Sequence, residues 1–359
     1  MRKLSINIKE ENIYYDIIIG NNILTDCSII SIIKDILRGS RVFIISDNIV
    51  ASLYLEDFKK ELEKFNIQVF SFILSSGESS KSIENVYSIY SSLADCEISR
   101  GDLIISFGGG VVGDISGFVS ATWMRGIDYI QIPTTLLSMV DSSIGGKTAI
   151  NIKEGKNLVG AFKSPKLVLM DINTLKSLPI REYNAGMVEI IKHSLLFDYN
   201  LFKKIEELYS NNKYIENTDD LENIIKRNCE LKGYIVEKDY KEKNDRMLLN
   251  FGHTIGHALE NVLGYGNILH GEAVAIGIVY AIKLGVELNI TKDTNLINRV
   301  KTLFNNLNID TMIPKNINLV NSIKLDKKRQ IETINFIFLE EIEKPIIKKI
   351  NILDFYSLV

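Results

Sequence analysis

The chain has 359 residues, of which 46% are hydrophobic and 24% charged, and its formal net charge is −3. This length favours two domains, and the composition is typical of a soluble globular protein. The small net charge argues against nucleic-acid binding, and the most apolar helical stretch, residues 273–282, is about half the length of a membrane span.

The first residues, 1–5, run into an alternating strand-like pattern rather than a continuous apolar segment, so we expect no signal peptide. Cys27, Cys96 and Cys229 are far apart and form no Cys-x-x-Cys motif, which is typical of reduced thiols. These features predict a cytoplasmic protein without nucleic-acid or membrane partners.

Short β-branched runs alternate with helical patterns in the first half of the chain. The strand-like runs are residues 41–47, 67–74, 102–107, 129–133 and 166–171. Because strands that alternate with helices usually pair in parallel, this half predicts a mainly parallel sheet with helices on its faces.

A glycine-rich loop follows the third of these runs. Residues 108–113 read Gly-Gly-Gly-Val-Val-Gly, which matches Gly-x-Gly-x-x-Gly between a predicted strand and a predicted helix. Backbone N–H groups at such a helix start suit a pyrophosphate, although a tight structural turn would have the same sequence. Asp47, after an earlier strand, and Asp114, beside the loop, could accept hydrogen bonds from ribose hydroxyls.

A second glycine segment, residues 141–148, ends in Gly-Gly-Lys-Thr like a nucleoside-triphosphate loop. Position 141 is Asp where that motif needs its first glycine, so the sequence argues against an ATPase. Lys147 could still bind an anionic substrate and Asp141 a hydroxyl; the alternative is a plain turn.

The pattern changes after about Leu178 and Pro179 to long helical stretches, which include residues 182–197, 221–237 and 272–288. We therefore predict a domain boundary at 179/180, with an α/β domain at 1–179 and an all-α domain at 180–359.

Three of the four histidines, His253, His257 and His270, lie within eighteen residues of this second half. On a helix, positions 253 and 257 share one face, a spacing that can bring two imidazoles onto one metal ion. Thr254 stands where a His-Glu-x-x-His protease has its glutamate, so a third ligand would have to come from elsewhere. The alternative is that these histidines are ordinary polar residues of a half-buried helix.

Several motifs together resemble the 3-dehydroquinate synthase family of the shikimate pathway, in order and spacing, from about residue 47 to 271. These motifs are Gly-Gly-Gly-Val-Val-Gly-Asp at 108–114, Ala-Thr-Trp-Met-Arg-Gly at 121–126, Pro-Thr-Thr-Leu-Leu at 133–137, residues 141–147, Lys-Asn at 156–157, Leu-Pro-x-Arg-Glu at 178–182, Glu-Ile-Ile-Lys at 189–192, residues 249–260 and His-Gly-Glu at 270–272.

The resemblance implies a homodimer with a Rossmann-like NAD-binding α/β domain, a helical metal- and substrate-binding domain, and an active site in the cleft between them. It also implies that NAD transiently oxidises 3-deoxy-D-arabino-heptulosonate 7-phosphate. Phosphate elimination, re-reduction and an internal aldol closure then give 3-dehydroquinate. By this likeness Glu189, His253 and His270 bind Zn²⁺, with Co²⁺ as an alternative. His257 then contacts substrate instead of metal, which replaces the pairing of positions 253 and 257.

The resemblance further assigns roles to polar residues elsewhere. NAD would contact Asp47, Glu78, Lys81, Gly109, Gly110, Val111, Asp114, Thr134, Thr135, Asp141, Lys156, Asn157, Ser177, Leu178 and Glu182. Substrate would contact Asp141, Lys147, Lys192, Lys232, Arg246, Asn250, His257 and Lys327, and Arg125 would reach its phosphate from the partner subunit.

The chain departs from the family pattern in a few places. Ser177 replaces the usual Thr, Lys163 and Ser164 replace an aromatic residue and Gln, and the lysines at 327–328 lack a following glycine. The first forty residues carry little family signal.

Other functions remain open at this stage. A 2-deoxy-scyllo-inosose synthase would share the fold, NAD and zinc, but Asn250 stands where those enzymes tend to carry an acid. A polyol dehydrogenase of the glycerol dehydrogenase type would release NADH. A non-catalytic binding module would not need a metal triad beside a dinucleotide loop.

Overall fold

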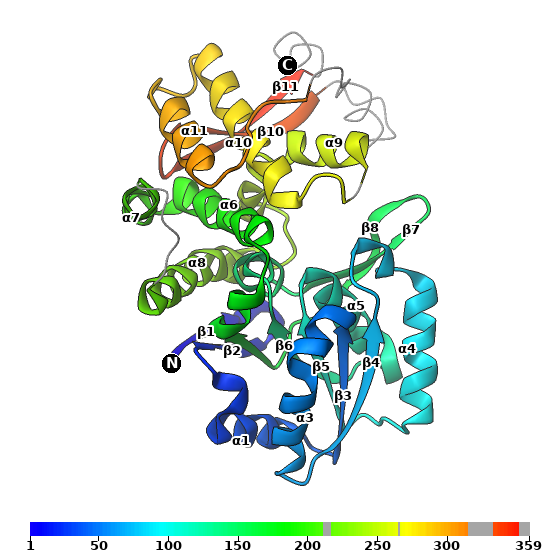
Figure 1. The fold of residues 1–359 in the computed structure, drawn as a ribbon. Coiled ribbons are helices and arrows are strands. Elements are labelled where there is room, and N and C mark those ends of the chain that lie inside the picture. The colour runs from blue at the N-terminus through cyan, green and yellow to red at the C-terminus, as the bar shows by residue number, and fades with distance from the viewer. Residues whose placement is uncertain (211–216, 265, 315–332, 352–359) are drawn as a thin grey trace. The chain divides into compact units, whose positions relative to one another are not determined.

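The structure, a computed structural model, describes residues 1–210, 217–264, 266–314 and 333–351. It contains two compact units, whose elements are labelled in Figure 1. Unit 1 comprises Met1–Pro179 and Lys232–Glu237, and unit 2 comprises Ile180–Leu231 and Lys238–Val359. The chain thus first passes from one unit to the other after Pro179, and a short piece of a later helix belongs to unit 1.

Unit 1 is built on a seven-stranded sheet in the order β1-β2-β9-β6-β5-β3-β4. Its strands are β1 (Arg2–Ile8), β2 (Ile13–Gly20), β3 (Arg41–Asp47), β4 (Gln68–Leu74), β5 (Leu103–Gly108), β6 (Asp128–Pro133) and β9 (Leu167–Asp171). β1 and β2 pair antiparallel, and every other pair of neighbours is parallel. The predicted mainly parallel sheet is confirmed. Strands β5 and β9 are buried along their whole length, as expected for strands covered on both faces.

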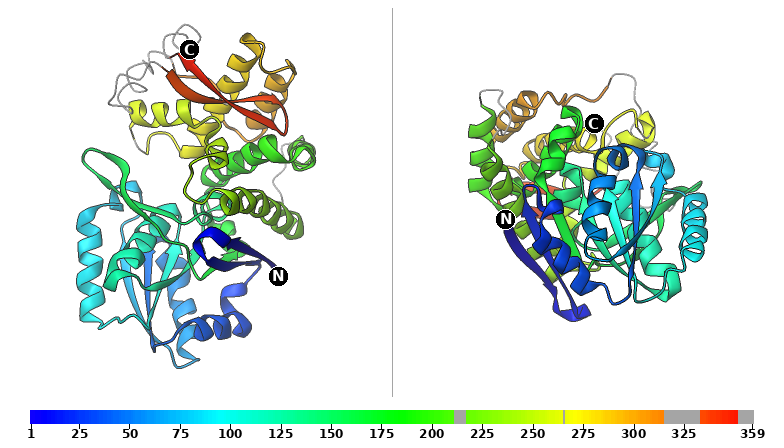
Figure 2. Two further views of the ribbon diagram at one scale, coloured as in Figure 1. Left: turned by 180° about the vertical axis from the view of Figure 1, so that it is seen from behind. Right: turned by 60° about the horizontal axis from the view of Figure 1, so that its bottom comes forward.

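Helices cover both faces of this sheet, as the two views of Figure 2 show. They are α1 (Cys27–Ile36), α2 (Asn48–Val50), α3 (Glu56–Glu63), α4 (Ile83–Asp95) and α5 (Gly110–Thr122). α1 and α3 pack into one apolar cluster, whereas α4 and α5 pack into another. In α4 the buried Val86, Ile89 and Leu93 recur at helical spacing, and each buried side chain contributes about 1.5–3 kcal/mol.

A separate antiparallel hairpin, β7 (Lys147–Ile152) and β8 (Gly155–Phe162), projects beyond the sheet in Figure 1 and in the left view of Figure 2. The sequence did not predict this hairpin. Its second strand has exposed Leu158, Val159 and Phe162, so it lacks the alternating burial that marks a strand in a sequence.

Unit 2 is mainly helical, as predicted. Its helices are α6 (Ile180–Phe197), α7 (Tyr199–Tyr209), α8 (Thr218–Lys238), α9 (His253–Leu263), α10 (His270–Glu287) and α11 (Leu296–Asn306). The last residues of α8, apart from Lys238, are the piece that belongs to unit 1. Helix α10 is buried on most sides and packs against α6 and α9, which makes it the central element of the unit.

Unit 2 also contains an antiparallel ribbon of β10 (Thr333–Glu341) and β11 (Lys344–Asn351), which packs on α10. The prediction of an all-α domain at 180–359 is therefore wrong in this respect, because the domain contains two strands. Buried Ile334, Phe336 and Phe338 alternate along β10, so the period-two signal of a strand was present in the sequence. Among the described residues, no helix is long and apolar enough to cross a membrane.

Candidate active site

Three helices of unit 2 bring Glu189, His253 and His270 together. Glu189 lies inside α6, while His253 and His270 are the first residues of α9 and α10. Two glycines of α10 allow the close packing that this requires. A Cβ on Gly271 would lie 2.1 Å from the carbonyl oxygen of Ala185, and one on Gly277 would lie 1.9 Å from that of Gly252. Gly271 and Gly277 therefore allow the short distances between α10 and the segments that carry Glu189 and His253.

The two histidines turn the same nitrogen toward the glutamate. His253 Nε2 lies 4.0 Å and His270 Nε2 3.9 Å from Glu189 Oε1, and the two imidazole centroids are 5.1 Å apart. On the other side of each ring, His253 Nδ1 lies 3.2 Å from the carbonyl oxygen of Phe251, and His270 Nδ1 lies 3.4 Å from Glu260 Oε2. Both acceptors favour a proton on Nδ1, which leaves the Nε2 lone pairs facing Glu189.

This cluster fits a divalent metal ion. Glu189 is fully buried, and within the described part of the chain its Oε1 has no hydrogen-bond partner, although an unpaired buried carboxylate oxygen is costly. Burial, followed by the charge of Lys192, holds the pKa of His253 well below its usual value, which favours the neutral ring that a metal ion would need. Two imidazoles and a carboxylate within 4.8 Å of one another form the donor set of catalytic zinc sites.

The second oxygen of Glu189 is already held. Lys192, one turn further along α6, donates to Glu189 Oε2, and both side chains are buried. His193 Nε2 lies 3.9 Å from the same oxygen, and its Nδ1 lies 2.8 Å from Asn228 Oδ1 on α8. Lys192, predicted to contact substrate, therefore also neutralises Glu189. Sequence reasoning gave no role to His193 or Asn228, because the contact between these two residues joins separate helices.

A turn before α9 arranges further predicted substrate contacts. Arg246 is buried, and its guanidinium donates to the carbonyl oxygen of Tyr240 at 2.6 Å. Asn250 Nδ2 donates to Glu242 Oε1 at 3.0 Å, which fixes the direction of the amide. His257, one turn after His253, is exposed, and the two rings meet edge to face at 5.3 Å. The exposure of His257 agrees with a contact to substrate more readily than with a metal ligand.

In unit 1 the glycine loop forms the start of α5. Gly109 precedes the helix in extended backbone, no side chain caps the helix start, and Gly110 and Val111 are its first residues. A Cβ added to Gly108 would lie 2.6 Å from the side chain of Val112. A Cβ added to Gly110 would contact only Ser142, with its Oγ at 3.3 Å. Side-chain packing therefore requires glycine at position 108, but it restricts position 110 much less. Close approach of a phosphate to the backbone would account for Gly110.

Polar side chains surround this helix start. Lys81 is buried and donates to both Asp114 and Asn157 Oδ1, while Lys156 Nζ lies 3.6 Å from Glu78 Oε1. Burial raises the pKa of Asp114, although the charge of Lys81 opposes this effect. Five of the predicted NAD contacts therefore form one network in the structure.

Other predicted NAD contacts lie at strand ends and turns. Asp47 Oδ1 accepts from the N–H groups of Ile49 and Val50 and so caps α2. Thr134 is buried, and its hydroxyl has no hydrogen-bond partner among the described residues, so it is available to a ligand. The remaining predicted contacts are Thr135, Ser177, Leu178 and Glu182. The hydroxyl of Thr135 bonds that of Ser138, and the hydroxyl of Ser177 lies 2.6 Å from that of Tyr54. Glu182 lies in the first turn of α6 in unit 2, and burial raises its pKa.

Predicted substrate contacts in unit 1 lie near the β7–β8 hairpin and α8. Lys232 Nζ donates to the carbonyl oxygen and to Oδ1 of Asp141, each at 2.5 Å, and Lys147 is exposed at the start of β7. Arg125 is exposed in a turn where φ is positive at Met124 (49°), Arg125 (66°) and Gly126 (122°). Two successive non-glycine residues in this region are strained, and such strain is common at functional sites. Lys327 lies outside the described residues.

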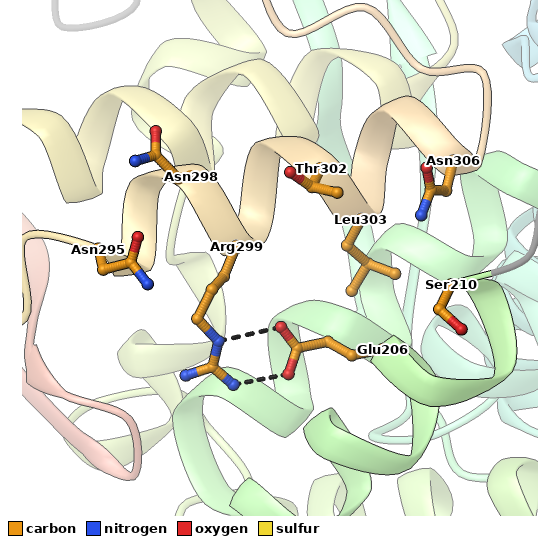
Figure 3. Close-up of a pocket in the computed structure, with 8 residues that line it drawn as sticks. All are labelled: Glu206, Ser210, Asn295, Asn298, Arg299, Thr302, Leu303 and Asn306. Carbon is orange, nitrogen blue, oxygen red and sulfur yellow. Dashed lines mark hydrogen bonds and ion pairs between the residues drawn. The ribbon is translucent and has the colours of Figure 1, made fainter.

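A pocket elsewhere in unit 2 contains none of these residues (Figure 3). It lies between α7 and α11 and is lined by Glu206, Ser210, Asn295, Asn298, Arg299, Thr302, Leu303 and Asn306. Arg299 and Glu206 bond each other through two contacts of 3.0 and 2.6 Å, and the guanidinium lies over the ring of Phe202. Because its charges satisfy each other, this pocket gives no indication of chemistry.

Solved structures share the fold of this chain. A 2-deoxy-scyllo-inosose synthase complexed with carbaglucose-6-phosphate, NAD⁺ and Co²⁺ has a TM-score of 0.85 at 24% identity, with 99% of this chain and 98% of that chain covered. A 2-epi-5-epi-valiolone synthase from Streptomyces hygroscopicus, with NAD⁺ and Zn²⁺ bound, has a TM-score of 0.85 at 24% identity, with 96% of each chain covered. The fold is that of the sugar phosphate cyclases.

Sequence comparison shows the family. The model of the 3-dehydroquinate synthase N-terminal domain matches residues 71–185, and that of the C-terminal domain matches residues 186–329. A 3-dehydroquinate synthase from Thermoanaerobacter pseudethanolicus is 45% identical over 315 residues, which cover 87% of this chain and 88% of that protein. The chain belongs to the 3-dehydroquinate synthase family.

Proposed function

We propose that this chain converts 3-deoxy-D-arabino-heptulosonate 7-phosphate to 3-dehydroquinate and phosphate, as an NAD- and divalent-metal-dependent carbon–oxygen lyase. The observation that carries the proposal is the buried Glu189, whose unpaired Oε1 faces the Nε2 atoms of two histidines in a chain with this family relationship. A cytoplasmic location and a homodimer remain predictions from the sequence.

Glu189, His253 and His270 would hold Zn²⁺, or Co²⁺, and the start of α5 with the Lys81 network would hold NAD. Structural relatives with NAD⁺ and one or the other metal bound support both assignments. When bound, the metal polarises a hydroxyl or carbonyl oxygen of the substrate, and NAD accepts and returns a hydride.

The residues of the chain prepare these two sites. The carbonyl oxygen of Phe251 and the carboxylate of Glu260 hold the Nδ1 protons of His253 and His270. Lys192 donates to Glu189 Oε2, which leaves Oε1 for the metal ion. In unit 1 the N–H groups at the start of α5 and the hydroxyl of Thr134 are available to the dinucleotide.

The substrate carries a phosphate and a carboxylate, which require cationic and hydrogen-bonding partners. We assign this role to Lys147, Lys192, Lys232, Arg246, Asn250 and His257, with Asp141 and Lys327 as further contacts. Arg125, in its strained turn, would serve the partner subunit of a homodimer. Glu242, which bonds Asn250, would fix the direction of that amide.

A comparison of three substrates tests the proposal. The full-length protein, with NAD and Zn²⁺, is given the heptulosonate phosphate, glucose 6-phosphate or glycerol, and both phosphate release and NADH absorbance are followed. We expect phosphate release from the heptulosonate phosphate without lasting NADH. Release from glucose 6-phosphate alone would favour an inosose synthase, and NADH from glycerol would favour a polyol dehydrogenase; either result would overturn the proposal.

A further inference from the structure

The β7–β8 hairpin of unit 1 has an irregularity at Asn151. Ile150 pairs with Val159, but Ile152 pairs with Gly155, so one residue of β7 lies opposite three residues of β8. Such bulges interrupt the hydrogen-bond ladder and redirect side chains, often beside functional sites. Here the bulged residues, 156–158, include Lys156 and Asn157, for which we propose NAD contacts.

Hydrogen bonds of the Asn151 side chain hold the bulge where the backbone pairing of the two strands is interrupted. Its Oδ1 accepts from the backbone N–H of Asn157 at 3.0 Å, and its Nδ2 donates to Glu78 Oε1 at 2.8 Å. Its own N–H donates to the carbonyl oxygen of Lys81 at 2.8 Å. Because the amide uses both its acceptor and its donor, its orientation is fixed, and it ties the bulge to the turn that carries Glu78 and Lys81.

The bulge contains a residue in an uncommon backbone conformation. Asn157 has a φ of 57°, in the left-handed region, which asparagine adopts more readily than most other non-glycine residues. In this conformation its side chain reaches the ammonium of Lys81, and Lys156 lies near Glu78. Asn151 thus bonds three residues of the proposed dinucleotide site, Glu78, Lys81 and Asn157, without belonging to that set.

We propose that Asn151 is a positioning residue for the dinucleotide site, acting through Glu78 and Asn157; this inference rests on the proposed function. It fixes the bulge before the dinucleotide arrives. Without the amide, NAD binding would have to order the hairpin itself, and the lost conformational freedom would lower affinity.

Titration calorimetry of NAD with the full-length, zinc-loaded protein measures this effect. In Asn151→Ala we expect NAD to bind about tenfold more weakly, as for the loss of one or two hydrogen bonds, with an unchanged zinc content. Asn184→Ala is the matched control, because it removes a buried amide that donates to the carbonyl oxygen of Leu307 at 2.7 Å in unit 2. It should lower the thermal midpoint without changing NAD affinity.

A second variant, Asn151→Asp, keeps the acceptor oxygen of the side chain and removes its donor, so it tests the two hydrogen bonds separately. It also provides a test if Asn151→Ala does not fold. Aspartate can still accept from Asn157 N–H, but it places a carboxylate against Glu78, so NAD should again bind more weakly. In a Glu78→Gln background the aspartate regains a donor, and the effect of Asn151→Asp should be smaller.

NAD affinity within twofold of the wild type in a folded Asn151→Ala protein would overturn the inference alone, as would an equal effect of Asn151→Asp in both backgrounds. A wild-type protein that does not bind NAD would overturn the proposed function as well.

Discussion

The metal cluster of unit 2 and the polar network of unit 1 are built in different ways. In unit 2, a buried glutamate and two histidines converge because glycines let their helices touch, and each histidine ring has an acceptor at its Nδ1. In unit 1, charged side chains from a turn, a helix and a hairpin satisfy one another around a helix start. The first arrangement depends on helix packing and the second on hydrogen bonds between loops.

This difference predicts different responses to mutation. Loss of one metal ligand cannot be compensated, because helices hold the other two in place. Loss of one member of the polar network leaves several partners that can re-pair. We therefore expect large effects in the metal cluster and graded effects around the dinucleotide site.

The largest effect is expected for His253→Ala or His270→Ala. Each removes one ligand, so bound zinc should fall toward zero and turnover by about a thousandfold or more, since metal polarisation contributes several kcal/mol to the reaction. Metal analysis of purified protein and phosphate release measure the two quantities. His257→Ala is the control, and it should keep its zinc. Full metal content in both ligand variants would show that the cluster is not the metal site.

Next in size is the removal of the carboxylate that faces His270. Glu260→Ala should weaken zinc binding by about 10- to 100-fold, because the Nδ1 proton of His270 loses its acceptor. Competition with a chelator gives the affinity, and the visible spectrum of the Co²⁺ form reports the ligand geometry. Glu260→Gln keeps an acceptor oxygen and should recover part of the affinity.

Glu206→Gln provides a matched change in the same unit, since Glu206 bonds only Arg299 in the pocket of Figure 3 among the contacts described above. It should leave zinc affinity unchanged. If it weakened zinc binding as much as Glu260→Ala, a general loss of stability would explain both results.

A smaller effect is expected for Gly110→Val at the start of α5. Its Cβ would contact only the Ser142 side chain, which needs to move by a few tenths of an ångström, so the fold should tolerate the change. The valine side chain would, however, stand where a phosphate approaches the backbone. NAD affinity should fall by about tenfold or more while zinc content stays at the wild-type level. An unchanged affinity in a folded variant would mean that the loop is only a structural turn.

The smallest effect concerns Asp102, which precedes β5 and so lies at the opposite end of that strand from the glycine loop. Burial acts to raise its pKa, but hydrogen bonds from Ser99, Arg41 and Ser40 outweigh burial and hold the pKa below its usual value. Asp102→Asn should lower the free energy of unfolding at pH 7 by about 1–3 kcal/mol, with no change in zinc or NAD binding.

The pH dependence of this difference follows from the lowered pKa. A carboxyl group with a lowered folded-state pKa contributes its full stability above its unfolded pKa of about 3.9. That contribution is lost as the pH falls through the folded pKa, so wild type and Asp102→Asn should converge in acid. Urea unfolding at neutral and acidic pH measures the free energy of unfolding of both proteins. A difference between them that stays constant with pH would contradict the lowered pKa of Asp102.

The sequence predicted the elements with strong periodicity. The buried strands at 41–47 and 102–107 and the helix at 182–197 lie where the structure has β3, β5 and α6, within two or three residues at each end. It missed the β7–β8 hairpin, whose second strand is exposed, because no alternating burial marks it. It also overlooked the alternation of β10, although that signal was present.

The candidate site was predictable in its types of residue but not in its connections. The histidine cluster stood out by its spacing, yet Glu189 came only from the family resemblance, since no local pattern links it to residues 64 positions further along the chain. Asn151 lies in none of the motifs, and Glu260, at the end of the motif at 249–260, was given no role from the sequence. Their roles depend on which side chains the fold places beside them, and only the structure supplies that information.

The most direct test of the account is the amount of 3-dehydroquinate formed per NAD supplied. The zinc-loaded protein is given a limiting, known amount of NAD and an excess of the heptulosonate phosphate, and the product is measured at completion. Because the hydride is returned within each turnover, we predict many product molecules per NAD and no lasting NADH absorbance. One product or fewer per NAD, with NADH accumulating in step with substrate consumed, would contradict the account.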